Sequence, residues 1–195
     1  MHLEQITAST GPPVSLDELR DHLRIDQSVD DADLTGKLRA ATEFCQRSVG
    51  GHRQFMKATY DQVLDEFPAN GRIDLPLPPL KSVTSVKYYD TDNTQQTLSS
   101  TAYHTITPTR QPGRVELVDG ESWPTTKVRP DAVKVRFVAG ATSTTGVDPT
   151  VKQAVYLLVG HWNENREATA AGSVPREIEL GLRSLLGANE YGAYG

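Results

Sequence analysis

Residues 148–167, DPTVKQAVYLLVGHWNENRE, carry the helical pattern around which we expect the fold to be organised. Asp148 can cap a helix, and Pro149 suits the first helical position because its missing N–H would have no partner there. Apolar residues then recur every three or four positions, which predicts one apolar stripe on a helix of about four turns. The stripe consists of Val151, Ala154, Val155, Leu158, Val159 and Trp162. We therefore predict a central core helix against which the other helices pack.

Three further helices are predicted. Ser15 and Glu18 form a capping-box pattern at the start of VSLDELRDHLRI, so a short helix should begin there. A second helix should run from residue 30 or 31 to about residue 49 and end at Gly50-Gly51. After the flexible link EATAAGS, Pro175 opens a terminal helix. The apolar face of the second helix comprises Leu34, Leu38, Ala41, Cys45 and Ser48, and that of the terminal helix comprises Ile178, Leu182, Leu185 and Leu186.

The pattern between residues 60 and 140 changes from helical to alternating. The clearest strand is AVKVRFVAG, in which Val133, Val135 and Phe137 should face inward. The prolines of RIDLPLPPL restrict that segment to an edge strand or a connection. Because no helical pattern intervenes to make parallel crossovers, we expect the strands to pair antiparallel.

These elements predict an α+β fold, with a small bundle of about four helices and an inserted antiparallel β unit. The insertion lies between the second helix and the long central helix. We expect an N-terminal arm (residues 1–13), a helical core in two pieces (14–58 and 147–187), the β unit (59–146) and a C-terminal tail (188–195).

Composition restricts the class of protein. A chain of 195 residues can bury one substantial core, and a net charge of −5 argues against a broad electrostatic grip on nucleic acid. The single cysteine, Cys45, allows no intrachain disulfide and suits a reducing compartment. The first residues do not resemble a signal peptide, and no apolar run approaches the roughly 20 residues that span a bilayer. We therefore expect a soluble, intracellularly made protein with no membrane partner.

The sequence offers no constellation of catalytic or metal-ligating residues. The histidines are scattered, and His161 in HWNEN lacks the second histidine of a zinc-protease helix. The acidic stretch after residue 25 fails as a calcium loop, because Asp31 replaces the required glycine and Lys37 the closing glutamate. Cys45 falls on an apolar face, where a buried and inert thiol is the usual outcome. We therefore predict no enzyme activity, no metal and no cofactor.

Two surface features have ordinary interpretations. The carboxylate pairs Asp65/Glu66 and Glu177/Glu179 are typical of solvated faces. Trp123-Pro124 could form a sugar-stacking platform, but a tryptophan in that setting more often closes the end of a small sheet.

The order of the parts nevertheless resembles a known family. The most specific pieces are LPLPPLKSV followed by YYD (residues 75–90), VRFVAG (135–140) and NREA (165–168), in that order. Across residues 14–187 the chain is similar to the head–tail connector proteins of tailed bacteriophages and gene transfer agents. These are also called head-completion or adaptor proteins, and the similarity is to the branch that carries a β insertion. The C-terminal SLLGANEYGAYG continues past the terminal helix, and the turn after the tyrosine pair reads DTDN where a glycine would be easier.

The resemblance implies a structural virion protein that forms a ring, usually twelvefold, beneath the portal at the head–tail junction (neck). The ring would extend the channel for double-stranded DNA without binding it specifically, and would present a platform for the next neck, stopper or tail protein. The protein would be made and assembled in the cytoplasm of the bacterial host. The terminal helix and tail would then dock onto the portal. The docking residues under this hypothesis are Ile178, Leu182, Leu185, Leu186, Tyr191 and Tyr194. The competing hypothesis for the helix is that it packs on its own core.

A second hypothesis belongs to a different class. The β unit could be a carbohydrate- or host-binding module that stacks sugars on Tyr88, Tyr89, Tyr103 and Trp123. Those rings would then have to be exposed together, whereas in a connector most of them would be buried or at subunit contacts. A hydrolase is disfavoured because no nucleophile–base pair can be named.

Overall fold

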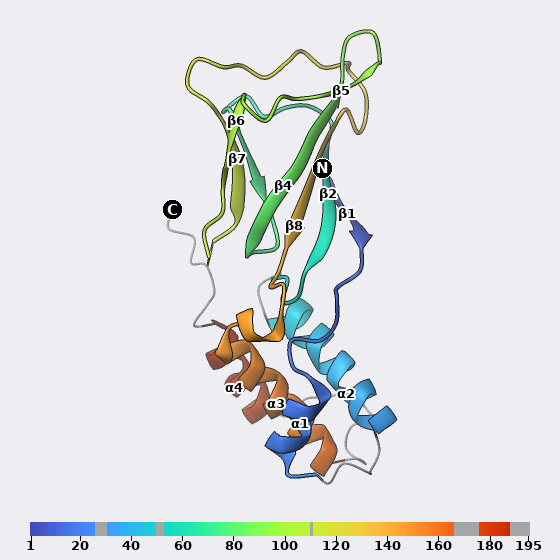
Figure 1. The fold of residues 1–195 in the computed structure, drawn as a ribbon, viewed down its shortest axis with the longest axis vertical. Helices are drawn as coiled ribbons and strands as arrows, with labels where there is room; N and C mark the ends of the chain where they lie inside the picture. The colour runs from blue at the N-terminus through green and yellow to red at the C-terminus, as the bar shows by residue number, and fades with distance from the viewer. Residues whose placement is uncertain (26–30, 50–52, 110, 166–175, 188–195) are drawn as a thin grey trace. The chain divides into compact units, whose positions relative to one another are not determined.

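The computed structural model describes residues 1–25, 31–49, 53–109, 111–165 and 176–187. The chain forms two compact units (Figure 1). Unit 1 comprises Met1–Thr10 and Lys57–Ala141, and unit 2 comprises Gly11–Met56 and Thr142–Gly195. The α+β class with an inserted antiparallel β unit is confirmed, because among the residues just given the helices lie in unit 2 and the strands lie in unit 1.

Unit 1 consists of two antiparallel sheets that share one core (Figure 1). The larger sheet has the order β1-β2-β8-β4-β5, and the smaller has the order β3-β7-β6. The strands are β1 (His2–Thr7), β2 (Ala58–Leu64), β3 (Arg72–Leu75), β4 (Leu80–Tyr89), β5 (Gln95–Thr97), β6 (Tyr103–Ile106), β7 (Gly113–Leu117) and β8 (Val133–Ala139). The shared core includes Phe137, Val135 and Val86 from the larger sheet and Ile73, Leu75 and Val115 from the smaller one.

The predicted strand patterns hold where one face of a strand is solvated. In β8, Val133, Val135 and Phe137 are buried and the residues between them are partly exposed, as the alternation requires. The proline-rich segment supplies β3 at the edge of the smaller sheet, as predicted. Every residue of β2 except Thr59 is buried. The strand lies between β1 and β8, and Arg136 of β8 covers the Asp61 carboxylate.

The N-terminal segment differs from the predicted arm. His2–Thr7 forms β1, which pairs antiparallel with β2 at the edge of the larger sheet. None of its six residues is buried. Neither face of the strand therefore requires apolar side chains, and the sequence lacks the alternation of apolar and polar residues that would have predicted a strand. The strand forms because β2 offers it a row of backbone partners.

Unit 2 contains α1 (Leu16–Leu23), α2 (Asp31–Phe44), the π-helical turn η1 (Cys45–Val49), the 3-10 turn η2 (Thr144–Gly146), α3 (Pro149–Glu164) and α4 (Arg176–Gly187). Both predicted caps are present, since Ser15 and Glu18 complete a capping box and the Asp148 carboxylate accepts from the Thr150 N–H. The second helix ends differently from the prediction, because its last five residues form a π-helical turn instead of α-helix. The glycines predicted to end it, Gly50-Gly51, lie outside the described residues.

The central helix α3 buries the predicted stripe. Val151, Ala154, Val155, Leu158 and Val159 are at most 2% exposed, while Trp162 is half-buried. Helix α4 packs against α3 closely enough that a Cβ at Gly181 would lie 3.2 Å from Leu157. No helix within the described residues has the length and apolar character that crossing a bilayer requires.

Candidate functional site

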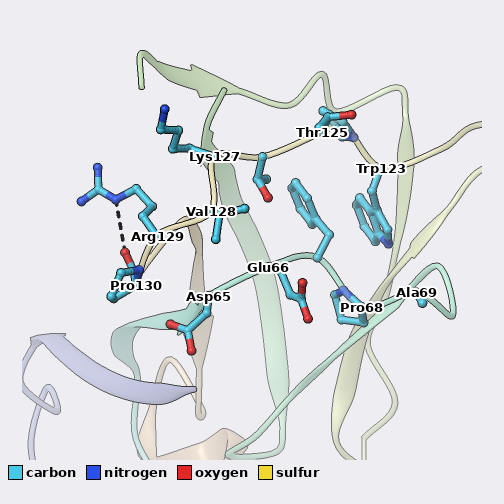
Figure 2. A pocket seen from close by; sticks show the side chains of 13 residues that line it. Asp65, Glu66, Pro68, Ala69, Trp123, Thr125, Lys127, Val128, Arg129 and Pro130 are labelled. Carbon is cyan, nitrogen blue, oxygen red and sulfur yellow. Dashed lines mark hydrogen bonds between the residues drawn. The ribbon is translucent and has the colours of Figure 1, made fainter. Parts of the chain in front are cut away.

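Unit 1 has an open hollow of about 690 Å³ (Figure 2). Two segments far apart in the sequence line it, namely residues 65–69 after β2 and residues 123–130 of the long connection between β7 and β8. The second segment has almost no regular secondary structure. The hollow is therefore built by two loops on a rigid pair of sheets, as many binding sites are.

Aromatic rings form the apolar wall of the hollow. The rings of Phe67 and Trp123 stack at a centroid distance of 4.7 Å and an angle of 3°, and Phe67 also contacts Tyr88 at 5.8 Å. All three pack against the core that the two sheets share. The indole Nε1 of Trp123 is buried and has no hydrogen-bond partner among the described residues. The wall is consequently fixed by the core rather than by its own loop.

The loop wall is anchored at the ends of two inner strands of the larger sheet, β4 and β2. The Lys127 N–H donates to the Tyr89 carbonyl at 3.0 Å, and the Asp131 N–H donates to the Asp65 carboxylate at 3.1 Å. The Arg129 guanidinium lies 4.1 Å above the Tyr89 ring. These contacts hold both ends of residues 127–131, so the hollow has a defined second wall.

The charges around the hollow are unevenly distributed. The carboxylates of Asp65 and Glu66 lie on one side of it, whereas the Lys127 amino group points away (Figure 2). Lys127 donates to the Thr91 carbonyl, and Arg129 donates to Asn93 at 3.0 Å as well as covering Tyr89. The partners of the two cations are neutral groups, so the lining combines two acidic and two basic side chains with an apolar wall.

The four aromatic residues of the carbohydrate hypothesis do not form one exposed surface. Tyr103 is only 9% exposed, and Trp123 has one ring face covered by Phe67. Tyr89 lies under the Arg129 guanidinium. Sugar stacking needs open ring faces side by side, and this arrangement does not provide them.

The structure describes part of the predicted docking site. Leu182 and Leu186 are 0% and 1% exposed, so they pack within unit 2 and could meet a portal only if α4 left its place. Ile178 and Leu185 are half-buried. Tyr191 and Tyr194 lie outside the described residues. The sequence analysis did not single out Leu180, which is 58% exposed on the same helix.

The titratable groups that the sequence singled out have structural roles. Burial raises the pKa of the Cys45 thiol to about 12, which leaves it a poor nucleophile at neutral pH. His161 lies 3.3 Å from the Asn165 side chain at the end of α3. Within the described part of the chain, no three His, Cys, Asp or Glu side chains gather in a way that could hold a metal ion.

Comparison with known proteins identifies the class. The family model for "Head completion protein" matches residues 14–174. This match spans most of the chain, so the protein belongs to the head completion protein family. The resemblance drawn from the order of its sequence motifs is thereby confirmed. No curated protein matched the chain in the sequence comparison.

Solved structures share the fold. One is the neck of an empty gene transfer agent particle computed with C6 symmetry, with 24% identity and a TM-score of 0.75 over 97% of this chain and 95% of that chain. A second is the virion of a native gene transfer agent particle, with 23% identity and a TM-score of 0.73 over 94% of each chain. A third is the neck of a native particle computed with C12 symmetry, with 23% identity and a TM-score of 0.71 over 95% and 94%. The similarity covers both units in each comparison.

Proposed function

We propose that this head completion protein forms a ring, twelvefold in the assembled virion, beneath the portal at the head–tail junction. The observation that carries the proposal is the family match over residues 14–174, which includes most of both units. The shared fold supports it, because the similar chains belong to necks computed with C6 and C12 symmetry. The ring would join the DNA-filled head to the neck or tail and extend the DNA channel.

The physical character of the chain fits this role. A head-to-tail ring needs two different surfaces on each subunit, and a chain with a helical unit and a β unit supplies them. A channel that passes DNA without holding it should avoid strong positive charge, since phosphate contacts create affinity. The net charge of −5 agrees with passage without specific binding. In this role the protein is structural and needs no cofactor.

We propose that portal contact uses the exposed part of α4 and the tail that follows it. Leu180, Ile178 and Leu185 offer apolar surface that unit 2 leaves at least partly uncovered. Tyr191 and Tyr194 could act as aromatic anchors, because tyrosine is favoured in protein interfaces. Leu182 and Leu186, which the sequence placed in the same site, would instead hold α4 on unit 2.

Co-sedimentation with the portal ring encoded by the same genome, followed by electron microscopy, tests the proposal directly. We expect an added ring coaxial with the portal, whose symmetry the images would give. A folded protein that does not bind an intact portal would refute the connector role.

Deletion of residues 188–195 tests the docking surface. We expect weaker portal attachment with an unchanged melting temperature. Leu180→Asp should have the same effect, whereas Asp92→Asn on an exposed turn of unit 1 is the matched control. Unchanged attachment in both the deletion and Leu180→Asp would exclude this docking surface while leaving the ring itself untouched.

A further inference from the structure

We propose that the chain modifies itself at Asn70, which loses ammonia to form a succinimide with the Gly71 nitrogen and then becomes aspartate or isoaspartate. The site lies in the turn that precedes β3. Water, with its hydroxide ion, is the other reactant. The inference does not depend on ring formation, because the turn lies entirely within unit 1.

The nucleophile of this reaction is the Gly71 backbone nitrogen, and the turn leaves it accessible. Gly71 has a φ of +70°, a conformation that favours glycine, and it carries no side chain that could shield its nitrogen. Its N–H donates to the Pro68 carbonyl at 3.4 Å, which is longer than the usual range for such a bond. The nitrogen can therefore give up its proton with little loss of hydrogen bonding.

The electrophile is the side-chain carbonyl carbon of Asn70, and a backbone donor activates it. The Arg72 N–H donates to Asn70 Oδ1 at 3.1 Å, which forms an Asx turn. Attack by the Gly71 nitrogen places negative charge on this oxygen, and a donor already aimed at it stabilises that charge. Asn70 is exposed, so hydroxide and water reach the turn. The same turn therefore presents the nucleophile and polarises its target.

Each step of the reaction conserves atoms and charge. Hydroxide takes the Gly71 amide proton, the nitrogen bonds to the Asn70 side-chain carbonyl carbon, and the bond from that carbon to the side-chain nitrogen breaks. The leaving nitrogen takes a proton from water, which regenerates hydroxide, and departs as ammonia. Water then opens the ring. Opening at the side-chain carbonyl gives aspartate, whereas opening at the main-chain carbonyl gives isoaspartate and routes the backbone through the former side chain.

Either product changes the turn before β3. Aspartate adds a negative charge to the turn, and isoaspartate adds the same charge and also lengthens the backbone. Ile73 and Leu75 of β3 are 1% and 0% exposed and hold the strand in the shared core. The added length must therefore be absorbed in the turn rather than by a shift of the strand.

Asn93 provides a comparison within the same unit, because it is also exposed in a turn and its side-chain oxygen also accepts a hydrogen bond, from Arg129. The two asparagines differ in the attacking nitrogen. The Thr94 N–H donates to the Asp90 carboxylate at 2.9 Å, and a hydrogen bond to a charged acceptor is stronger than one to a carbonyl. We therefore expect Asn93 to lose ammonia at least about tenfold more slowly than Asn70 in the folded chain.

The test is incubation of the full chain at pH 8.5 and at pH 6, followed by tryptic digestion and mass spectrometry. Asn70 is the only asparagine in peptide 58–72, and Asn93 is the only one in peptide 88–110. We expect peptide 58–72 to gain the mass difference between an amide and an acid, faster at pH 8.5, and to become a substrate for isoaspartyl methyltransferase. No change in this peptide from the folded chain, under conditions where the urea-unfolded chain reacts, would overturn the proposal.

Two variants separate the turn geometry from the dipeptide sequence. Thr94→Gly gives Asn93 a following glycine but keeps the backbone N–H that Asp90 accepts, so Asn93 should remain about tenfold slower than Asn70. Asn70→Ser should abolish the mass change in peptide 58–72, which also contains Gln62. Equal rates at Asn70 and Asn93 in Thr94→Gly would refute the role of the turn, and a mass change that persists in Asn70→Ser would refute the assignment to Asn70.

Discussion

Gly113 in the smaller sheet of unit 1 lies directly against Leu80 in the larger sheet, and its replacement by alanine tests this packing. A Cβ at Gly113 would lie 2.2 Å from Cδ2, 2.5 Å from Cβ and 2.8 Å from Cγ of Leu80. Leu80 is 3% exposed and begins β4, whereas Gly113 begins β7 in the other sheet. Gly113 does not have a positive φ, so its role is to leave space rather than to permit a special conformation.

The structure places the cost of Gly113→Ala at the upper end of the usual range. Overpacking of a core typically costs about 1–3 kcal/mol. Here the Leu80 Cβ is one of the clashing atoms, and a rotation of the side chain cannot move it away. Replacing a glycine also lowers the conformational entropy of the unfolded chain, but this stabilises the folded state by only about 0.4–1 kcal/mol. We therefore expect a net loss of about 2–3 kcal/mol in the free energy of unfolding of unit 1.

Urea unfolding followed by Trp123 fluorescence in a Trp162→Phe background measures this loss in unit 1. Leu80→Ala alone should cost about 2–5 kcal/mol, and the double variant should cost less than the sum because two of the three clashing atoms are gone. Gly36→Ala in α2 is the control, since a Cβ there meets nothing within 4 Å and the variant should not lower the stability that Trp123 reports. A Gly113→Ala protein as stable as the wild type, or strict additivity with Leu80→Ala, would refute the reasoning.

Three further predictions concern unit 2. The pKa of Glu18 is lowered, first by the hydrogen bond from Lys152 and then by the Ser15 N–H, so its contribution to stability is present above the ordinary value of 4.5 and is lost as the pH falls through the lowered pKa. Glu18→Gln should therefore destabilise the protein to urea at neutral pH and much less in acid, and an equal effect at both would contradict the ion pair. Leu182→Ala should lower the free energy of unfolding by about 2–5 kcal/mol, because Leu182 is fully buried, and a stability matching the wild type would show that α4 does not pack as described. With its pKa raised from 9.0 to about 12, the Cys45 thiol should react with a thiol reagent about a thousandfold more slowly in the folded protein than in urea, and rapid reaction in the native state would disprove its burial.

The elements that were predictable from the sequence are those whose local chemistry and burial agree. In α3 the Asp148 cap, Pro149 and the apolar stripe all indicate one helix, and the structure contains it. The capping box of α1 was predictable for the same reason, because its two residues, Ser15 and Glu18, are only three positions apart in the sequence. Strand β1 was missed because its residues are exposed and its pairing depends on β2, more than fifty residues away in the sequence.

The hollow could not be predicted for the same reason. Asp65 and Glu66 look like an ordinary solvated pair until the loop that carries Trp123 and Val128 is placed beside them. Trp123 stacks on Phe67 and packs against the shared core, while the interpretation that it closes the end of a small sheet stays a prediction. No local pattern shows that residues 65–69 and 123–130 meet, because only the pairing of β2 with β8 brings these segments together.

The interleaved division of the chain has a consequence for synthesis on the ribosome. Unit 1 has all its residues once Ala141 has emerged, whereas unit 2 still lacks α3 and α4 at that moment. Since domains fold as units during translation, we expect the two sheets to form first. Leu34, Leu38 and Ala41 of α2 must then wait without their packing partners until the last quarter of the chain is made. The nascent protein is therefore most exposed to aggregation and to chaperones late in translation, when its sheets are already complete.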